Sequence, residues 1–320
     1  MPFDTVDLSA EVTPQMLDRQ ITDDRAWLNS CFDPTSSIVL LDAPALAEID
    51  MLVECLHSAP LPLVMRDHED FDLPALRSVM ARVRGNLTNG IGFSVVDALP
   101  MDDYDEIDMK TVFWIVGQFL GRTVAQKWDG TMIYDVTDTG KKFGYGVRGS
   151  FTNVELVFHN DNAFGVVTPD VVGLLCKYPA SSGGVSRFCS LYSVHNKMLA
   201  EHPELLRRLY RPMFFDRQAE HSLGAPKTIW APFFSYGGEK LSARANVQLV
   251  RKGYQVAGAD MEIELADALD AVEEVGSRKD LWLELPIERG QMQYLNNVEL
   301  AHYRSNFEDH DDLAKKRHLF

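Results

Sequence analysis

Two histidines and an aspartate in this sequence have the residue types and the spacing of a metal-binding set. His159 and Asp161 are separated by one residue, and His302 follows much later, shortly after Asn296-Asn297. On an extended segment alternate side chains point to the same side, so His159 and Asp161 can reach one ion. Two imidazoles and one carboxylate form the facial triad of non-haem Fe(II) sites, which leaves positions open for cosubstrate and dioxygen. The pattern therefore predicts an iron-dependent oxygenase.

Two other classes of protein are compatible with these three side chains. A metal-dependent hydrolase could hold zinc on two histidines and an aspartate, although the sequence contains no HExxH motif. A non-catalytic small-molecule-binding protein is the other alternative, and an intact triad argues against it. A His-x-Asp pair alone is often an ordinary polar pair, so its significance depends on the elements around it.

Length, charge and composition narrow the class further. The chain has 320 residues, 46% of them hydrophobic, and a formal net charge of −16, which argues against a general nucleic-acid binder. No apolar run approaches the ~18 residues of a membrane span, and residues 1–7 lack the basic start and apolar core of a signal peptide. We expect a cytoplasmic protein with a small-molecule substrate and no nucleic-acid or membrane partner; a homo-oligomer is compatible with the sequence. The cysteines show no CxxC spacing and are expected to be reduced thiols: Cys31, Cys55, Cys176 and Cys189.

Residues 1–120 are expected to be mostly helical. Thr13-Pro14 offers a capping hydroxyl followed by proline, which predicts a helix start. Apolar residues at helical spacing predict further helices over residues 45–57, 74–84 and 105–120, the second ending near Gly85. Residues 91–96 are expected to form a buried strand.

From residue 121 the pattern changes to short apolar runs separated by Gly, Pro, Asn and Asp, which is typical of an antiparallel β architecture. The expected strands are residues 131–136, 171–176, 186–191, 229–234, 241–249, 281–285 and 291–295. Helices are expected over residues 193–210, broken near Pro203, and over residues 262–275. We therefore predict a single mainly β domain over residues 1–320 with helical flanks (α+β), in which residues 1–120 support a β core formed by residues 121–320.

Further motifs surround the candidate triad in a fixed order along the last two thirds of the chain. They are Gly92-Phe93, Leu99-Pro100, residues 121–126, Asp129-Gly130, residues 155–161, residues 183–188, Asn296-Asn297, residues 302–304, residues 307–309 and residues 317–319. In order and spacing they resemble the Fe(II)/2-oxoglutarate dioxygenases of the taurine dioxygenase family, in the branch that also resembles clavaminate synthase. The fold implied by this resemblance is a double-stranded β-helix, a jelly roll with helical supports.

The resemblance also implies an activity. His159, Asp161 and His302 match the family's iron ligands. Fe(II), 2-oxoglutarate and O2 would together oxidise an unactivated C–H bond of a small polar molecule, with release of succinate and CO2. Hydroxylation is the usual outcome, and desaturation or cyclisation remain open. Halogenation is disfavoured because Asp161 occupies the coordination position that a halide would need.

Two residues match the family's 2-oxoglutarate site. Ser186 lies 27 residues after His159, where the family places a hydroxyl that binds a cosubstrate carboxylate. Arg317 lies 15 residues after His302, where the family has an arginine for the distal carboxylate. A guanidinium pairs bidentately with a carboxylate, so the assignment is chemically sensible. A second arginine of the family pattern would fall just past Phe320.

The resemblance also indicates positions that line the substrate pocket, although an ordinary structural role is open for each: Gln126, Glu155, Asn162, Phe164 and Arg304. Glu155 lies four residues before His159, and strict alternation would point both to the same side. A β-bulge before His159 would instead turn Glu155 outward. A carboxylate in the pocket favours a cationic group, so we expect a substrate that bears an amine, such as an amino acid or a derivative.

Overall fold

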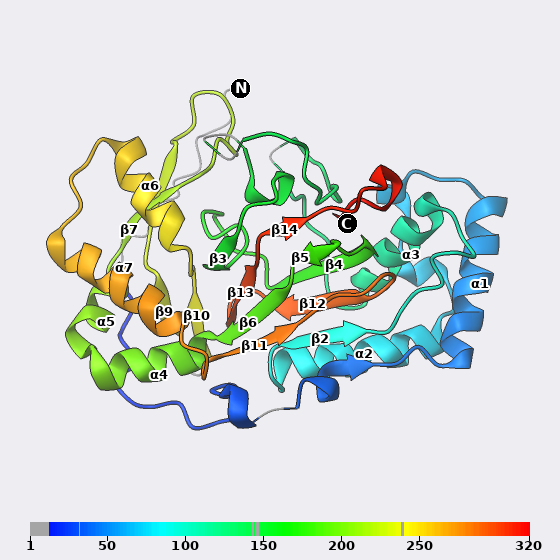
Figure 1. Ribbon diagram of the computed structural model, residues 1–320. Helices are drawn as coiled ribbons and strands as arrows, with labels where there is room; N and C mark the ends of the chain where they lie inside the picture. The colour runs from blue at the N-terminus through cyan, green and yellow to red at the C-terminus, as the bar shows by residue number, and fades with distance from the viewer. Residues whose placement is uncertain (1–12, 32, 128, 143, 145–146, 238–239) are drawn as a thin grey trace.

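The computed structural model describes residues 13–31, 33–127, 129–142, 144, 147–237 and 240–320. Two β-sheets occupy the middle of the molecule, with α1–α3 at one end and α4–α7 at the other (Figure 1). The helices are α1 (Ala43–Ser58), α2 (Pro74–Thr88), α3 (Glu106–Gln118), α4 (Leu191–Glu201), α5 (Pro203–Leu209), α6 (Val247–Ala257) and α7 (Ile263–Gly276).

One sheet has five strands, in the order β1-β2-β12-β4-β15. They are β1 (Ile38–Val39), β2 (Phe93–Val96), β12 (Met292–Asn296), β4 (Val171–Tyr178) and β15 (His318–Leu319). All their pairings are antiparallel except that of β1 with β2. The apolar faces of α1–α3 pack against this sheet and share a buried cluster with Met292 and Tyr294 of β12.

The other sheet has four antiparallel strands, in the order β11-β6-β13-β3. They are β11 (Trp282–Leu285), β6 (Ser186–Ser190), β13 (Leu300–Arg304) and β3 (Leu156–His159). Three short pairs complete the strands: β5 (Ser182–Gly183) with β14 (Phe307–Glu308), β7 (Met213–Asp216) with β8 (Thr228–Ala231), and β9 (Phe234–Gly237) with β10 (Lys240–Ala243).

The two sheets face each other through a shared apolar cluster. Phe93 of β2 stacks on Phe188 of β6 with ring centroids 4.6 Å apart. Phe188 pairs with His302 across β6 and β13, so His302 shares this inner face of the four-stranded sheet. Because strand side chains alternate, Arg187 and Tyr303 point to the opposite, outer face.

Side-chain caps fix where several helices begin. Asp42 accepts a hydrogen bond from the Ala45 amide at the start of α1, and Asp105 does the same for Asp108 in α3. Asn246 caps α6 in the same way. Together with the apolar spacing, the caps of α1 and α3 explain why the helices predicted at residues 45–57 and 105–120 are confirmed. The helix predicted at 262–275 is confirmed by α7, which has no side-chain cap, and the helix at 193–210 is confirmed with its break at Pro203.

Most expected strands are also confirmed. Strands occur within or across residues 91–96, 171–176, 186–191, 281–285 and 291–295, and residues 229–234 are divided between β8 and β9. The helix predicted over residues 74–84 continues through Gly85 to Thr88. A single glycine lowers helix stability by about 1 kcal/mol, which packing of Val83 and Leu87 in the core can offset.

The helix predicted to start at Thr13-Pro14 is wrong. Residues 13–28 contain no helix, because side chains from elsewhere hold this segment in an irregular path. Asn196 of α4 accepts from the backbone N–H of Ile21 and donates to its carbonyl, and Trp27 donates from Nε1 to the carbonyl of Ile91. Tertiary contacts thus override the local capping signal.

Two strand predictions also require correction. Residues 131–136 form no strand, and only Val136 makes an isolated bridge, to Leu319. Residues 241–249 were expected to be one strand, but β10 ends at Ala243 and α6 begins at Val247. The change occurs where the Asn246 side chain accepts from the Leu249 amide and starts the helix.

The expected state of the cysteines is confirmed. Cys31 and Cys55 are exposed thiols, while Cys176 and Cys189 are buried thiols. Burial raises the pKa of the Cys176 thiol to about 12. Within the described ranges, no helix is both long and apolar enough to cross a membrane.

Candidate metal centre

Strands β3 and β13 bring two histidines together on the inner face of the four-stranded sheet. His159 and His302 are paired in the antiparallel register, with ring centroids 4.2 Å apart. Nε2 of His159 lies 3.6 Å from Oδ1 of Asp161, and Nε2 of His302 lies 3.7 Å from Oδ2 of the same carboxylate. One ligand atom from each residue lies within 4.8 Å of the others, so all three can reach one ion.

The protonation states of the three side chains suit metal binding. Nδ1 of His159 lies 2.8 Å from the carbonyl of Val157, which can only accept, so Nδ1 donates to it and Nε2 is the nitrogen left to bind a metal. Burial and the neighbouring His159 lower the pKa of His302 to about 4, although Asp161 opposes this shift. Burial raises the pKa of the Asp161 carboxyl, but the two histidines hold it well below its usual range. Two neutral nitrogens and one anionic oxygen are the donor set that non-haem Fe(II) takes.

Two buried asparagines fix the chain on either side of the aspartate. Asn160 accepts from the Ala245 amide and donates to the carbonyl of Leu300. Asn297 accepts from the Asp161 amide at 2.8 Å and donates to the carbonyls of Asp161 and Pro169. Both asparagines are fully buried. The turn that carries Asp161 is therefore tied to the strands that carry the two histidines.

Replacing Asn297 tests this bracing. We expect Asn297→Ala to lower the free energy of unfolding by about 2–4 kcal/mol, because it removes the buried Asn297 amide and leaves partly buried backbone groups of Asp161 and Pro169 without this partner. Iron affinity should fall as well, since Asp161 loses its fixed position. The measurements are urea unfolding and an iron titration, with the exposed Asn153→Ala as the matched control. Equal stability of Asn297→Ala and the control would contradict the bracing role.

Two buried arginines lie close together near the ends of β13 and of the chain. Arg304 and Arg317 are 6% and 4% exposed, and both guanidinium groups lie over the ring of Phe307. Burial and the charge of Arg317 together lower the pKa of Arg304 to about 9, and burial lowers the pKa of Arg317 to about 10. In the described part of the chain, Nε and Nη1 of Arg304 and Nη1 of Arg317 have no hydrogen-bond partner. Buried like charges with free donors are costly unless an anion joins them.

The surroundings of these arginines agree with a carboxylate site. Ser186 pairs with Arg304 across β6 and β13, so its side chain belongs to the same inner face. Gly184 has φ +65°, and a Cβ there would come within 3.0 Å of Nε of Arg317, so the backbone approaches the guanidinium closely. Arg304, expected to contact substrate, instead donates to the carbonyl of Thr152 at 2.9 Å and faces Arg317. These positions suit an acid such as 2-oxoglutarate.

The prediction that Glu155 points to the same side as His159 is wrong. His302 pairs with His159, but Arg304 pairs with Leu156, so two steps along β13 match three along β3. This bulge breaks the alternation before His159. Glu155 consequently lies on the outer face, where its carboxylate accepts a hydrogen bond from the hydroxyl of Tyr303.

Of three other residues that were expected to contact substrate, one is buried and two are exposed. Phe164 is 6% exposed and packs in the hydrophobic core, which agrees with the structural role left open for it. Asn162 is exposed, directly follows Asp161 and has φ 52°. Gln126 is exposed, and its amide donates to the carbonyl of Val124. Asn162 and Gln126 remain candidate substrate contacts.

Sequence reasoning missed an ion pair beside the triad. Arg148 binds Glu220 with Nη2 2.8 Å from Oε1, and both side chains are largely buried. Arg148 also donates to the carbonyl of Gln126, and its charge is near enough to lower the pKa of Asp161. The two charges are 72 residues apart in irregular segments, so no local pattern marks them.

A second missed residue is Arg244, which supports the loop after Asp161. Its Nη1 donates to the carbonyls of Ala163 and Gly165, both at 2.7 Å, and Nη2 donates to Val166. One side chain thereby hydrogen-bonds three backbone carbonyls of this loop. A lone arginine after a strand gives no sequence signal for this role.

Comparison with known proteins finds similar chains over most of the sequence. FR-33289 synthase from Streptomyces rubellomurinus is 28% identical over 95% of this chain and 90% of its own length. An asparagine oxygenase structure in complex with Fe(II), 2S,3S-3-hydroxyasparagine and succinate matches with a TM-score of 0.67 at 18% identity, over 88% of this chain and 92% of that one. The non-haem iron oxygenase OrfP with Fe and alpha-ketoglutaric acid matches with a TM-score of 0.62 at 15% identity, with the same coverage; another OrfP structure holds Fe and L-Arg.

The family match covers most of the chain, including every residue of the candidate centre. Residues 57–320 match the family described as taurine catabolism dioxygenase TauD, TfdA family. The matched segment contains the His159, Asp161 and His302 cluster and the buried Arg317. This chain is a member of the TauD/TfdA family of non-haem Fe(II)- and 2-oxoglutarate-dependent dioxygenases.

Proposed function

We propose that His159, Asp161 and His302 hold Fe(II), and that the enzyme oxidises an unactivated C–H bond of a small polar metabolite bearing an amine. Hydroxylation, with release of succinate and CO2, is the expected reaction. The observation that carries this proposal is the cluster of two imidazoles on the neighbouring strands β3 and β13 with the carboxylate of Asp161, whose ligand atoms all lie within 4.8 Å of one another. When bound, iron and 2-oxoglutarate supply the oxidising chemistry.

The fold proposed for this site is a double-stranded β-helix, or jelly roll. Two sheets face each other through an apolar cluster, and the chain crosses from one sheet to the other between β3 and β4 and again between β12 and β13. Such an arrangement places ligands from distant segments at one end of the sandwich.

Arg317 and Ser186 are proposed to bind 2-oxoglutarate. A guanidinium that is 4% exposed and has a free Nη1 can pair with the distal carboxylate without competition from water. Ser186 adds a hydroxyl donor on the same face. Arg304 strengthens the positive potential beside Arg317 and keeps the carboxylate in its ionised form.

The substrate is proposed to be an amino acid or a derivative. The asparagine oxygenase complex contains a hydroxylated asparagine, and an OrfP structure contains L-Arg. The Arg148–Glu220 pair takes over the role first expected of Glu155: it offers one positive and one negative group near Asp161. A free amino acid carries the same two charges, so its carboxylate can bind Arg148 and its ammonium Glu220. Two such contacts would orient one C–H bond toward the metal.

Kinetics of variants test this substrate assignment. Amino acids and related metabolites are first screened for substrate-stimulated succinate formation. With the best substrate, we expect Arg148→Met and Glu220→Gln each to raise KM by on the order of tenfold or more, while the 2-oxoglutarate requirement stays close to wild type. Arg207→Met, which removes an exposed arginine paired with Glu204, is the matched control. Unchanged KM in both variants would place the substrate elsewhere.

A further inference from the structure

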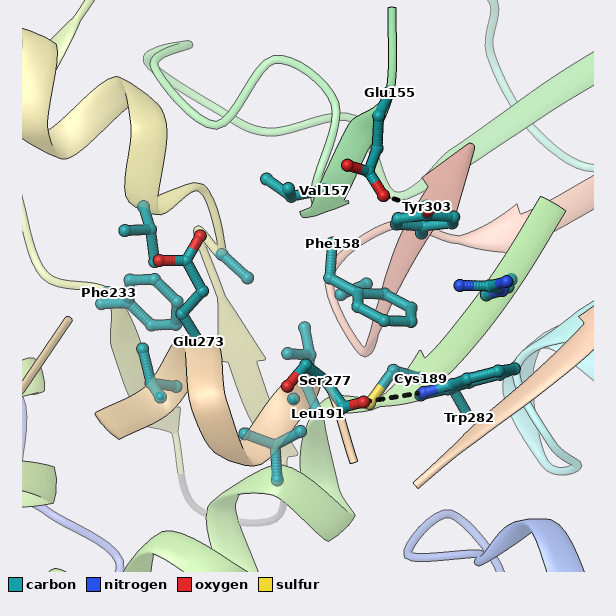
Figure 2. A pocket seen from close by; sticks show the side chains of 17 residues that line it. Glu155, Val157, Phe158, Cys189, Leu191, Phe233, Glu273, Ser277, Trp282 and Tyr303 are labelled. Carbon is teal, nitrogen blue, oxygen red and sulfur yellow. Dashed lines mark hydrogen bonds between the residues drawn. The ribbon is translucent and has the colours of Figure 1, made fainter. Parts of the chain in front are cut away.

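The outer face of the metal-bearing sheet closes a separate cavity, here called the outer cavity, of about 240 Å³ (Figure 2). Its floor consists of side chains that alternate with inner-face residues, such as Phe158 beside His159 and Tyr303 beside His302. Helix α7 and the segments around β9 and α6 form the other walls. Neither His159, Asp161 nor His302 lines the outer cavity, so it lies behind the proposed active site.

The walls of the outer cavity are mainly apolar. They include Leu191, Val194, Phe233, Val247, Val272 and Trp282. An apolar cavity of ~150 Å³ already accommodates a molecule the size of benzene. The outer cavity can therefore take a small aromatic or aliphatic body.

Two carboxylates reach the outer cavity from different elements. Glu273 extends from α7, and Glu155 precedes β3 (Figure 2). Glu155 accepts a hydrogen bond from Tyr303. Glu273 is partly buried, and no basic side chain of the described ranges makes an ion pair with it. A partly buried carboxylate without a partner is unfavourable, and a cationic ligand would relieve this cost.

The basic residue that lines the outer cavity is already neutralised. Nε of Arg187 donates to Glu284 at 2.8 Å. Its guanidinium lies 4.4 Å from the ring centroid of Trp282 and 4.6 Å from that of Tyr303. Because Arg187 is paired and held between these rings, the unpaired charge in the outer cavity is negative.

We propose that the outer cavity binds a small organic ammonium ion with an apolar body, whose amine pairs with Glu273. The apolar walls would take the body of the ligand, and the carboxylate would select a charged amine over a neutral group of the same shape. The site is distinct from the metal centre and does not depend on the substrate of the enzyme.

Calorimetry with a matched pair of probes tests this proposal. The iron-loaded protein is kept anaerobic with 2-oxoglutarate and titrated with 2-phenylethylamine and with its neutral analogue 2-phenylethanol. Wild type should bind the amine at least roughly tenfold more tightly, and Glu273→Gln should remove most of this preference. Asp267→Asn removes one exposed charge from the same helix and should bind like wild type.

A variant that fills the outer cavity distinguishes probe binding in this cavity from probe binding at the metal centre. Gly276 lines the outer cavity, and a Cβ built there meets no heavy atom within 4 Å, so Gly276→Leu should fill the space without disturbing the helix. This variant should lose binding of both probes. Binding of the amine that persists in Gly276→Leu, or a preference for the amine that persists in Glu273→Gln, would overturn the proposal, as would a wild type that binds neither probe.

Discussion

His302→Ala is expected to abolish substrate-stimulated succinate formation and to lower iron occupancy while the fold survives. The variant removes one of three ligand atoms that lie within 4.8 Å of one another, and the remaining two cannot hold the open face of the metal in place. His159→Ala should behave in the same way, and Asp161→Ala should likewise abolish succinate formation. Activity is followed as succinate release, and iron by metal analysis of the purified protein.

The controls for this experiment separate metal loss from unfolding. His310→Ala removes a histidine from the same C-terminal part of the chain, outside the cluster, and should keep full activity. Asp161→Gly should retain more iron than His302→Ala, because both imidazoles remain. Near-normal turnover in His302→Ala would rule out this ligand set.

Arg317→Ala is expected to raise the 2-oxoglutarate requirement much more than the substrate requirement. Loss of a buried charge-assisted pair costs about 2–5 kcal/mol, which corresponds to a roughly 30-fold to several-thousand-fold weaker affinity. Arg317→Lys should recover part of the loss, since it keeps the charge but not the bidentate geometry. The measurement is a 2-oxoglutarate titration at saturating substrate.

A second arginine serves as control for that titration. Arg289 pairs with Asp102 at the surface, so Arg289→Ala removes a positive charge without touching the proposed cosubstrate site. Its 2-oxoglutarate requirement should match wild type. If Arg317→Ala required no more 2-oxoglutarate than Arg289→Ala, the cosubstrate would have to bind elsewhere.

The metal cluster could be predicted from sequence because two of its three ligands are close together in the sequence. His159 and Asp161 are two positions apart, and only His302 had to come from another strand. The same alternation failed four residues earlier, at Glu155, because a bulge adds one residue to β3. A bulge depends on the pairing of two strands, so one strand's sequence does not reveal it.

The helices and strands could likewise be predicted where their signal is local, but not where contacts with distant residues decide the structure. Helix α6 was missed because apolar and polar residues alternate over residues 241–249, which is the pattern of a strand, although α6 begins at Val247. Its signal was present in the Asn246 cap and in the apolar spacing of Leu249, Val250 and Tyr254. The Thr13-Pro14 signal, in contrast, was overridden by contacts with α4, which no local pattern contains.

The proposed substrate contacts were the least predictable part of the site. Arg148 and Glu220 come from irregular segments far apart in the sequence, one before β3 and one after β7. They meet only in the folded chain. Arg304 looked like a substrate contact by its position two residues after His302, but burial beside Arg317 changes what it can do. Loop conformation and burial decide these roles, and neither is encoded in spacing.

The most direct test of the central claim is an anaerobic titration of the protein with Fe(II) and 2-oxoglutarate, followed by visible absorption. Chelation of iron by 2-oxoglutarate on the His159, Asp161 and His302 cluster predicts a weak charge-transfer band that saturates with one iron per chain. The band should be absent in His302→Ala and should need far more 2-oxoglutarate in Arg317→Ala. A wild-type protein without this band, or a band that is unchanged in His302→Ala, would contradict the proposed centre.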